Sequence, residues 1–437
     1  MNILLFPTRF FPAISGGDFY LQRLGKEFLK MNRGRDKDSH NKVLILSTNA
    51  LDFGALHGKG RYIFEKQKYY GQFQNLSLLR FKIQKIDHKE YKKEERDLQR
   101  LCIEFLGLSN EISNILIKNG PILPLLNEKL LSGNIKEIIP FKPDVIHCSY
   151  LPYANLLYTL IISKVFKIPS IVTPFLHDSN LRYQNHNLFK ILNKFDKIIA
   201  CTNYEKKKYI ENGIEAYKIK VLPMGVDMDK FQKDKRIHFL KNFSIHSPII
   251  LFCGHKNYEK GALSLIETLP LIYEELPNIS AIFIGSSTKA FNYKLRTLKK
   301  NFPSLKIINL SPDNLSGVFD PIKIGAFQIA DLFCMPSRSD AYGIAYLEAW
   351  ACKKPVIAIR KNPMTEIIND DSDGLLVKFD DTNELKSAII KLLNDPKKRE
   401  LMGEKGFLKI SINNNWSDIA AKTIEIYTKI GRTNEYE

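Results

Sequence analysis

The sequence predicts an α/β fold made of two doubly wound domains, each with a parallel sheet. Short β-branched runs alternate with helical segments of ten or more residues, a pattern typical of parallel strands covered by helices on both faces. The chain has 437 residues, which suits two domains of roughly 200 residues better than one core. Hydrophobic residues make up 44% and aromatic residues 11%, as in a globular protein.

The first half begins with the strand "NILLFP", a glycine-containing loop and the amphipathic helix "YLQRLGKEFLKM". Residues 52–140 are less regular, and the charged stretch "KIDHKEYKKEERDLQR" indicates a solvated helix. Further strands are predicted at "KVLILST", "PDVIHCS", "PSIVTP", "KIIAC" and the start of "KIKVLPMGVD", with a helix at "YANLLYTLIISKVF".

The second half repeats this alternation more regularly. Its predicted strands are "IILFCG", "SAIFIG", "LKIINL", "DLFCMP", "PVIAI" and "GLLVKF", and its predicted helices are 261–276, 289–301, 343–352 and 382–394. We place the break near 243–248, which gives domains 1–245 and 246–412. The remaining residues, 413–437, form a predicted amphipathic helix that we expect to pack back towards the first domain.

Open α/β sheets bind ligands outside the carboxyl ends of their strands. We therefore expect one substrate on each domain and an active site in the cleft where the two domains face each other.

Positive charge is concentrated in the first half of the chain. Residues 1–245 carry 40 Lys and Arg against 24 Asp and Glu, whereas residues 246–437 carry 25 against 23. This asymmetry favours an anionic partner for the first half, such as a membrane surface or a phosphate-bearing lipid, although ordinary solvated lysines explain it equally well. No nucleic-acid-reading motif accompanies the charge, so no nucleic-acid partner is expected.

No apolar run approaches the roughly 20 residues that span a bilayer, and no leader-like segment is visible. We expect a cytoplasmic protein, with peripheral contact to the inner face of the cell membrane as an option. The six cysteines are scattered without metal-ligand spacing, so we expect reduced thiols and no metal site.

A loop at the end of the strand "IILFCG" has the residue types that bind phosphate. Backbone N–H groups from Gly254 onward and a positive side chain, Lys260, would meet a diphosphate there, with His255 or Lys256 assisting. A surface lysine beside a turn glycine is the structural alternative, and spacing alone does not decide between them.

The stretch "SRSDAYGIAYLEAWACKKPVIA" places two carboxylates around a predicted helix start. The backbone N–H groups of Tyr342, Gly343 and Ile344, just after Ala341, would favour an anion. Asp340 before the helix and Glu348 on its second turn would accept hydrogen bonds from hydroxyl groups on either side of that anion. This is a site for a nucleotide-sugar, unless the two acids are ordinary surface residues.

These segments resemble those of the retaining GT-B glycosyltransferases of family 4. The stretch around Asp340 and Glu348 resembles the E-x7-E segment of that family, and "GHKNYEKG" resembles its G-R-x-x-x-x-K-G. Other similar segments, in the family's order, are the glycine pair 16–17, "VTPFLHD", "VLPMGVDMDKF" and "NPMTEIINDDSDGLLV". The resemblance covers nearly the whole chain and implies two Rossmann-like domains facing across a cleft.

The resemblance also implies roles for single residues. Asp340 corresponds to the glutamate that binds the donor sugar and Glu348 to the one that holds the ribose. Lys260 corresponds to the lysine at the diphosphate. Gly17 corresponds to the glycine loop near donor phosphate and acceptor, and His177 to the histidine near the transferred sugar. His177, Lys260 and Asp340 are thus the expected catalytic residues.

The family works without a metal or other cofactor, so the D-x-D pairs Asp36/Asp38, Asp227/Asp229 and Asp371/Asp373 are expected to be loop carboxylates. The chain also departs from the family pattern. His255 stands for an arginine, Asp340 for a glutamate, Lys353 for a glycine and Met224 for an asparagine, and Lys361 and Asn362 stand where two glycines are usual.

The resemblance implies a retaining glycosyltransferase, with a hexosyltransferase expected. Its donor would be a nucleoside-diphosphate-sugar and its acceptor a hydroxyl of a glycan or lipid-linked oligosaccharide in glycoconjugate biosynthesis. Two alternatives stay open: a non-catalytic nucleotide-sugar-binding module with this fold, and a sugar-nucleotide epimerase. The epimerase would need acid/base residues for which no comparable set is visible.

Overall fold

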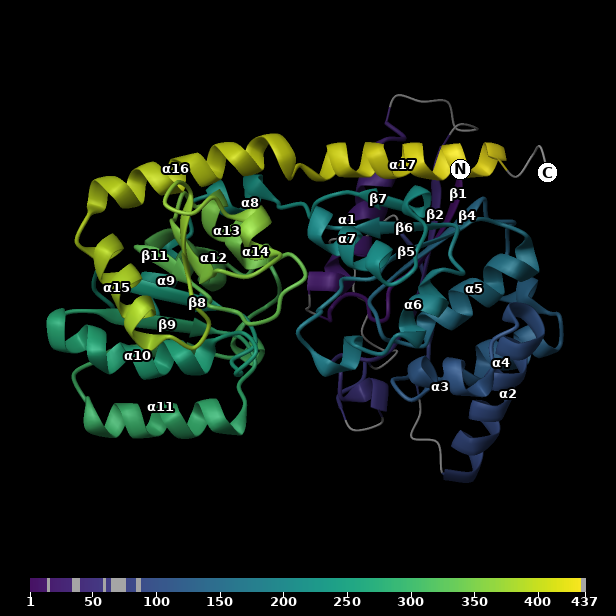
Figure 1. The fold of residues 1–437 in the computed structure, drawn as a ribbon, viewed down its shortest axis with the longest axis horizontal. Helices are drawn as coiled ribbons and strands as arrows, with labels where there is room; N and C mark the ends of the chain where they lie inside the picture. Colours follow the sequence, from purple (N-terminus) through teal and green to yellow (C-terminus); the bar gives the residue numbers. More distant parts are fainter. Residues whose placement is uncertain (14–15, 34–39, 58–59, 64–75, 84–87, 434–437) are drawn as a thin grey trace. The chain divides into compact units, whose positions relative to one another are not determined.

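The computed structural model describes residues 1–13, 16–33, 40–57, 60–63, 76–83 and 88–433. These residues form two units, each around its own parallel sheet (Figure 1). Unit 1 comprises Met1–Pro223 and Trp416–Glu437, and unit 2 comprises Met224–Asn415. The prediction of two doubly wound α/β domains is confirmed.

Unit 1 contains a parallel sheet of seven described strands in the order β3-β2-β1-β4-β5-β6-β7. The strands are β1 (Asn2–Phe6), β2 (Lys42–Thr48), β3 (Ser77–Phe81), β4 (Val145–Ser149), β5 (Ser170–Thr173), β6 (Lys197–Ala200) and β7 (Ile219–Val221). The α-helices are α1 (Gly16–Lys30), α2 (His88–Leu106), α3 (Asn110–Ile117), α4 (Pro124–Leu131), α5 (Asn155–Phe166), α6 (Asn187–Leu192), α7 (Asn203–Glu211) and α17 (Trp416–Thr433). The 3-10 helices among the described residues of unit 1 are η2 (Ala55–His57), η3 (Ile135–Glu137), η4 (Leu181–Tyr183) and η5 (Ala216–Lys218).

Unit 2 contains six parallel strands in the order β10-β9-β8-β11-β12-β13. The strands are β8 (Ile249–Cys253), β9 (Ser280–Ile284), β10 (Lys306–Leu310), β11 (Leu332–Cys334), β12 (Val356–Ile359) and β13 (Gly374–Val377). The helices are α8 (Met228–Gln232), α9 (Arg236–Leu240), α10 (Ala262–Glu275), α11 (Lys289–Asn301), η6 (Pro312–Asn314), α12 (Pro321–Ile329), α13 (Ile344–Ala351), α14 (Met364–Ile367), α15 (Thr382–Leu393) and α16 (Pro396–Asn413).

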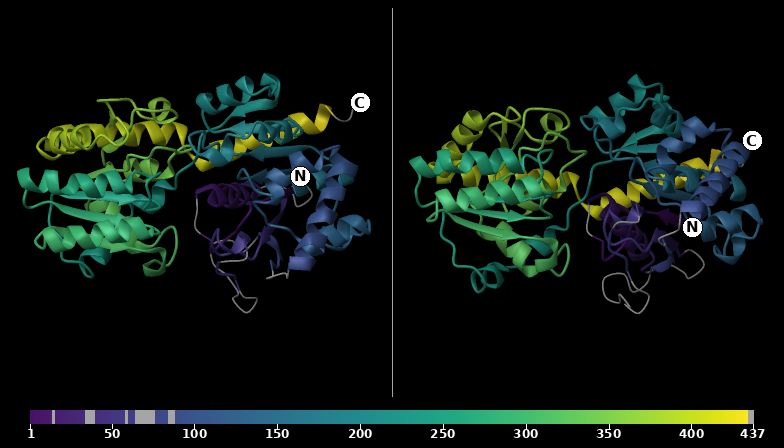
Figure 2. Two further views of the ribbon diagram at one scale, coloured as in Figure 1. Left: turned by 60° about the horizontal axis from the view of Figure 1, so that its bottom comes forward. Right: turned by 90° about the horizontal axis from the view of Figure 1, so that it is seen from below.

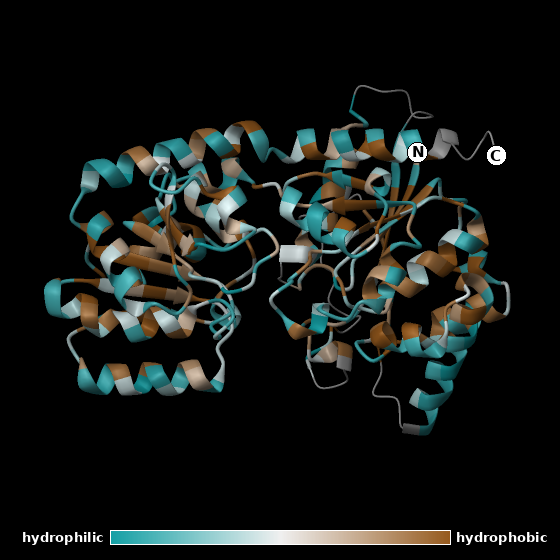
Figure 3. Cartoon of the chain, viewed as in Figure 1, coloured by the Kyte–Doolittle hydropathy of each residue, from teal (hydrophilic) through white to brown (hydrophobic). Residues whose placement is uncertain are grey.

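The central strands are apolar because helices cover both faces of each sheet (Figure 2). Every residue of β4, β9 and β12 is buried. The hydropathy colouring shows the reverse on outer helices such as α2 and α11, which are largely hydrophilic (Figure 3). Of the charged stretch predicted as a solvated helix, residues 88–100 lie in α2 and residues 85–87 lie outside the described residues. One face of α2 is packed, since Leu98, Leu101 and Cys102 are fully buried.

The strand order reverses once in each sheet, between β1 and β4 in unit 1 and between β8 and β11 in unit 2. At such a switch point the loops from two neighbouring strands leave in opposite directions, and a ligand crevice opens at the carboxyl ends of the strands. In unit 2 these loops carry the predicted Lys260 and Asp340.

The division between the units differs from the break expected at 243–248, because residues 224–245 belong to unit 2. There α9 packs on α12 and α8 on α13. Gln328 of α12 donates to the carbonyl oxygens of Phe231 and Lys233, at 2.8 Å each. The C-terminal helix α17 belongs to unit 1, where the Trp416 ring lies 5.9 Å from the Tyr20 ring of α1.

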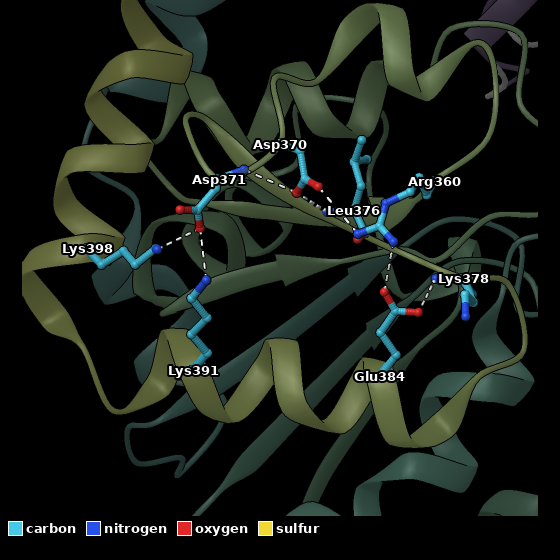
Figure 4. A network of polar contacts seen from close by, with 8 residues as sticks. All are labelled: Arg360, Asp370, Asp371, Leu376, Lys378, Glu384, Lys391 and Lys398. Carbon is cyan, nitrogen blue, oxygen red and sulfur yellow. Dashed lines mark hydrogen bonds and ion pairs between the residues drawn. The ribbon is translucent and has the colours of Figure 1, made fainter.

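A polar network ties the end of unit 2's sheet to its last helices (Figure 4). Lys391 of α15 and Lys398 of α16 donate to one carboxylate oxygen of Asp371, at 2.9 and 2.6 Å. Arg360, after β12, donates to Glu384 of α15 at 3.1 Å and also to the carbonyl oxygen of Leu376 in β13.

Candidate functional site

Two loops meet at the switch point of unit 2, residues 254–261 after β8 and residues 335–343 after β11. The amide of Arg338 donates to the carbonyl oxygen of Glu259 at 2.8 Å. Gly261 has a φ of 72°, and a Cβ there would lie 2.1 Å from the carbonyl oxygen of Pro336. Only glycine therefore lets the two loops come this close without strain.

The loop contact brings Lys260 and Asp340 together. Lys260 Nζ lies 2.8 Å from Asp340 Oδ2 and donates to the carbonyl oxygen of Ser339 at 3.2 Å. The amide of Lys260 donates to Asn257 Oδ1 at 2.8 Å, which fixes the backbone beneath the ammonium group. The side chains of Lys260 and Asp340 are 23% and 11% exposed, so solvent and a ligand can still reach the pair.

Helix α13 begins directly after this pair. Gly343 is its N-cap with a φ of 82°, and no side chain in the described part of the chain caps its first turn. A Cβ at Gly343 would lie 2.5 Å from the Tyr346 ring, so glycine is required for packing as well as conformation. An uncapped helix start directs backbone N–H groups and the positive end of the helix dipole at whatever lies in front of it, which favours an anion.

Ala341 and Tyr342, between Asp340 and the helix, are 7% and 9% exposed. The Tyr342 hydroxyl accepts a hydrogen bond from Asn414 Nδ2 at 2.9 Å. The phenol thus anchors the loop to the end of α16, and the contribution predicted for Tyr342 comes from its backbone. The amide of Ile344, the first residue of α13, belongs to the same uncapped turn.

Glu348 lies on α13 in a buried ion pair that the sequence reading did not include. Lys323 Nζ of α12 donates to Glu348 Oε1 at 2.7 Å, and the two side chains are 11% and 8% exposed. Burial lowers the pKa of Lys323, but the charge of Glu348 and the hydrogen bond to it outweigh burial, so the pKa is raised overall. Lys323 therefore stays protonated and holds one oxygen of Glu348.

The two predicted helpers of Lys260 differ in placement. The Lys256 side chain is fully buried, and its ammonium donates to Asn309 Oδ1 and, at 2.8 Å, to the carbonyl oxygen of Leu310. Burial lowers its pKa to about 8. This lysine therefore binds acceptors at the end of β10 and does not assist Lys260.

His255 is exposed, and its Nδ1 lies 3.1 Å from Asn257 Nδ2. Desolvation and then the charges of Lys260 and Lys256 lower its pKa below the usual value. The imidazole is therefore neutral at pH 7 and can donate a hydrogen bond there but no full positive charge. Gly254, immediately before it, donates its amide to the Ile284 carbonyl oxygen at 2.9 Å.

Ser339 is a second residue that sequence reasoning missed. Its side chain is 6% exposed, and its hydroxyl has no hydrogen-bond partner among the described residues. It sits between Arg338 and Asp340, on the loop whose carbonyl binds Lys260. A buried hydroxyl without a partner is costly, which makes it a candidate for ligand contact. Its position just before Asp340 is the only sequence signal that could have identified it.

Unit 1 carries the other two predicted residues at its own sheet end. Gly17 lies in the first turn of α1, and a Cβ there would lie 2.0 Å from the Tyr150 ring and 3.2 Å from Phe175. Tyr150 follows β4, across the switch point from β1. The His177 ring is half-buried after β5, 5.4 Å from the Tyr183 ring. Glycine at 17 thus permits close aromatic packing at this edge.

Lysine side chains bind two of the described D-x-D carboxylates. Lys391 and Lys398 bind Asp371, and Lys409 binds Asp373. Asp227 is the N-cap of α8, whereas Asp36 and Asp38 lie outside the described residues. In the part of the chain that the structure describes, no three His, Cys, Asp or Glu side chains gather in metal-binding geometry. None of the described helices is long and apolar enough to cross a membrane.

Two family models match the chain. Residues 234–409 match the model described as "Glycosyl transferases group 1", and residues 111–230 match "Glycosyltransferase Family 4". A D-inositol 3-phosphate glycosyltransferase of Pseudarthrobacter chlorophenolicus is 28% identical over 246 residues. That match covers 54% of this chain, and it spans little more than half, 57%, of the relative's length.

Solved structures share the fold over the whole chain. Sucrose-phosphate synthase from Thermosynechococcus elongatus has a TM-score of 0.68 at 17% identity, with 99% of each chain covered. Anabaena HepE, crystallised in complex with UDP-glucose, has a TM-score of 0.66 at 16% identity and covers 98% of this chain and 99% of its own. At these identities the likeness concerns the fold.

Proposed function

Because this chain belongs to the group 1 glycosyltransferases of family 4, we propose that it transfers a sugar from a nucleoside-diphosphate-sugar to a hydroxyl group, with retention of configuration. The observations that carry the proposal are the contact between Lys260 and Asp340 and the uncapped start of α13, which follows Asp340 in the same loop. One cation, one carboxylate and one helix start are what a diphosphate attached to a sugar requires.

Each group has a part in this proposal. Lys260 and the first-turn amides of α13 bind the diphosphate and stabilise the charge that builds up as it leaves. Asp340 accepts hydrogen bonds from hydroxyls of the transferred sugar, and Glu348 accepts them from the ribose. His255 adds a neutral hydrogen bond, because its pKa is lowered. His177 and Gly17 would serve the acceptor side, as the family resemblance implies.

In the proposed reaction, the bond between the anomeric carbon and the diphosphate oxygen breaks, and its electron pair leaves with the phosphate. The acceptor oxygen bonds to the same carbon from the same face, and its proton passes to the departing diphosphate oxygen. No second carboxylate is proposed as a nucleophile, and the reaction is proposed to need no metal or other cofactor. Lys260 contributes because its charge meets the oxygen that becomes more negative.

The donor proposed first is a UDP-sugar, since HepE has been crystallised in complex with UDP-glucose. The acceptor is proposed to be a glycan or a lipid-linked oligosaccharide, reached by peripheral contact with an anionic membrane face. The lysines of unit 1 support an anionic partner. A small anionic acceptor is the competing option, since the inositol relative named above acts on a phosphate-bearing acceptor by its name.

One edge of unit 1 carries an excess of lysine over acidic residues. Residues 187–221, from α6 to the edge strand β7, contain eight Lys against four Asp or Glu, whereas α2 carries five basic and five acidic residues. Tyr217 and Ile210 are 64% and 43% exposed among these lysines. Vesicles containing phosphatidylglycerol should retain the protein at low salt, and vesicles of phosphatidylcholine alone should not. Equal retention by both would argue against the membrane contact.

The central test is thermal stabilisation by UDP, GDP, ADP, dTDP and their common sugars. A nucleotide that binds only the folded protein raises the melting temperature. At a concentration one hundred times its Kd, it adds about 2.7 kcal/mol to the unfolding free energy. We expect one base to stabilise the wild type and Glu400→Ala, a change of an exposed glutamate on α16, but not Glu348→Ala. If no nucleotide stabilises the wild type, the protein has no working donor site and the proposal is wrong.

A further inference from the structure

Lys323 is the closest charged neighbour of Glu348 in the described residues, and it comes from a different helix. Its Nζ is 2.7 Å from Glu348 Oε1, and the pair is about nine-tenths buried. Two aromatic rings complete its surroundings, Phe231 at 5.7 Å and Phe327 at 5.8 Å from Nζ. The ammonium group is thus enclosed by one carboxylate and two π-faces, an arrangement that binds a cation well.

The start of α12 fixes where this ammonium lies. Asp320 is the N-cap and accepts hydrogen bonds from the amides of Ile322 and Ser316, at 2.7 Å each. Pro321 occupies the first helical position, which suits its fixed φ. Lys323 follows in the first turn, so its backbone is anchored by a capped helix end, and its side chain contacts Glu348 of α13.

A buried ion pair of this kind is weak evidence for stability. Removing two charges from water is costly, and an apolar pair of similar volume often stabilises a fold equally well. The orientation of the carboxylate, however, decides whether a ligand hydroxyl can donate a well-aligned hydrogen bond to it. The pair on α12 and α13 therefore calls for a reason connected with the ligand of Glu348.

We propose that Lys323 is a positioning residue that orients Glu348 towards the ribose of the donor and sets how strongly the protein prefers a ribonucleotide over a 2′-deoxyribonucleotide. The inference rests on the proposed function, in which Glu348 accepts hydrogen bonds from the ribose. With Oε1 held by Lys323, the orientation of the carboxylate is fixed. The other oxygen, Oε2, then points in one direction. A ribose hydroxyl can donate to it without the Glu348 side chain having to reorient on binding.

The test compares binding of UDP and 2′-deoxy-UDP to the full chain by calorimetry, or of GDP and its 2′-deoxy form if GDP stabilises the wild type instead. The wild type should bind the ribonucleotide about ten-fold more tightly, as expected for a hydrogen bond to a charged group. Lys323→Met should reduce this preference to about three-fold or less, mainly by weakening the ribonucleotide, and Lys323→Arg should restore most of it.

Lys323→Met leaves a buried carboxylate without its cation, which can prevent folding. The double variant Lys323→Met/Glu348→Gln, which removes that charge, is therefore measured beside it. The double variant should show the same loss of preference, since neither variant presents an oriented carboxylate. A control variant, Lys294→Met, breaks an exposed ion pair between α11 and Glu267 of α10 in the same unit and should leave the preference unchanged.

Three results would overturn the inference. If Lys323→Met weakens both nucleotides equally, the lysine has only a structural role. If the wild type binds both nucleotides equally, Glu348 does not read the 2′-hydroxyl. If no nucleoside diphosphate binds the wild type, the proposed function itself fails, and this failure is distinct because no variant is needed to see it.

Discussion

Lys260 and Asp340 are 80 positions apart in the chain, and their side chains form an ion pair with 2.8 Å between Nζ and Oδ2. The proposed roles of the two residues differ, since one binds phosphate oxygens and the other sugar hydroxyls. A diphosphate must therefore share the ammonium group with Asp340 or displace the carboxylate from it. The carboxylate also repels the phosphate, because both are negatively charged. Asp340 should favour the sugar and oppose the bare nucleotide.

We predict that Asp340→Asn separates these two effects. UDP should bind roughly three- to ten-fold more tightly, because a neutral amide no longer competes for Lys260, with the gain limited by the partial exposure of the pair. A UDP-sugar should lose its advantage over UDP, because the amide is a poorer acceptor for sugar hydroxyls. Calorimetry of both ligands checks this. Asp340→Glu, which keeps the charge, is the control, and weaker UDP binding by Asp340→Asn would contradict the prediction.

Ser339→Ala should affect binding without affecting the fold. The Ser339 hydroxyl is buried and has no partner in the part of the chain that is described, so its removal should leave the melting temperature unchanged or slightly higher. If the hydroxyl contacts the donor sugar, the UDP-sugar should bind about five- to ten-fold less tightly, with UDP itself unaffected. Ser337→Ala is a contrasting variant, since Ser337 Oγ donates to the Ser339 carbonyl oxygen at 3.0 Å and its loss should destabilise the loop.

The strands of unit 2 could be predicted because parallel strands covered on both faces are continuous apolar runs bounded by turns. β3 was not predicted, since "SLLRF" is short, lies at the sheet edge and has only Phe81 buried. α12 was also missed, because it is short and Gly325 interrupts its apolar pattern. Its Asp-Pro start was a visible signal of a capped helix.

The loops of the candidate site could be located from sequence, but the partners of their side chains could not. A motif gives the order of residues and not the distance between helices, so the pairing of Glu348 with Lys323 has no signature along the chain. Lys256 shows the same limit in the other direction. It is adjacent to His255 in sequence, yet its ammonium points to Asn309 and Leu310, because a buried strand end offers it two acceptors.

Lys353 shows how a backbone requirement can persist when the residue changes. The family resemblance described above implies glycine at this position, and Lys353 has a φ of 56°, in the left-handed region that favours glycine. Its ammonium donates to Glu404 at 2.7 Å. Lys353, just after the end of α13, thus keeps the left-handed backbone conformation that glycine adopts without strain. The side chain of lysine makes this conformation strained, which the sequence alone did not reveal.

Gly261→Ala should destabilise unit 2 and weaken nucleotide binding together. A Cβ would lie 2.1 Å from the Pro336 carbonyl oxygen, so the two loops that hold Lys260 and Asp340 would have to separate. We expect a loss of more than about 2 kcal/mol in unfolding free energy, from steric overlap added to left-handed strain. Gly213 has a φ of 85°, and a Cβ there would have no heavy atom of another described residue within 4 Å, apart from its chain neighbours. Gly213→Ala therefore introduces the left-handed strain without steric overlap and should cost about 1 kcal/mol. Equal losses in denaturant melts would contradict the steric explanation.

Asp371→Asn should weaken the network shown in Figure 4 without disturbing the backbone. Asn tolerates the φ of 59° found at Asp371 as well as Asp does, so the change isolates the charge bound by Lys391 and Lys398. The pair of contacts is on the surface, and we expect a loss of about 0.5–1 kcal/mol that shrinks in high salt. Urea melts at low and high ionic strength measure it, and a loss that does not depend on salt would point to a cause other than charge.

Lys256 should make stability rise with pH above about pH 8. In the folded protein burial lowers its pKa to about 8, whereas the unfolded chain keeps the ordinary value of 10.5. Between these values the unfolded chain binds more protons than the folded one, and stability therefore increases with pH across this window. Other groups titrate in the same range, so the quantity to measure is the difference in unfolding free energy between the wild type and Lys256→Met. That difference should shift in favour of the wild type by roughly 2–3 kcal/mol from pH 7.5 to 10.5. A difference that stays constant with pH would show that burial does not lower the pKa of Lys256 below its value in the unfolded chain.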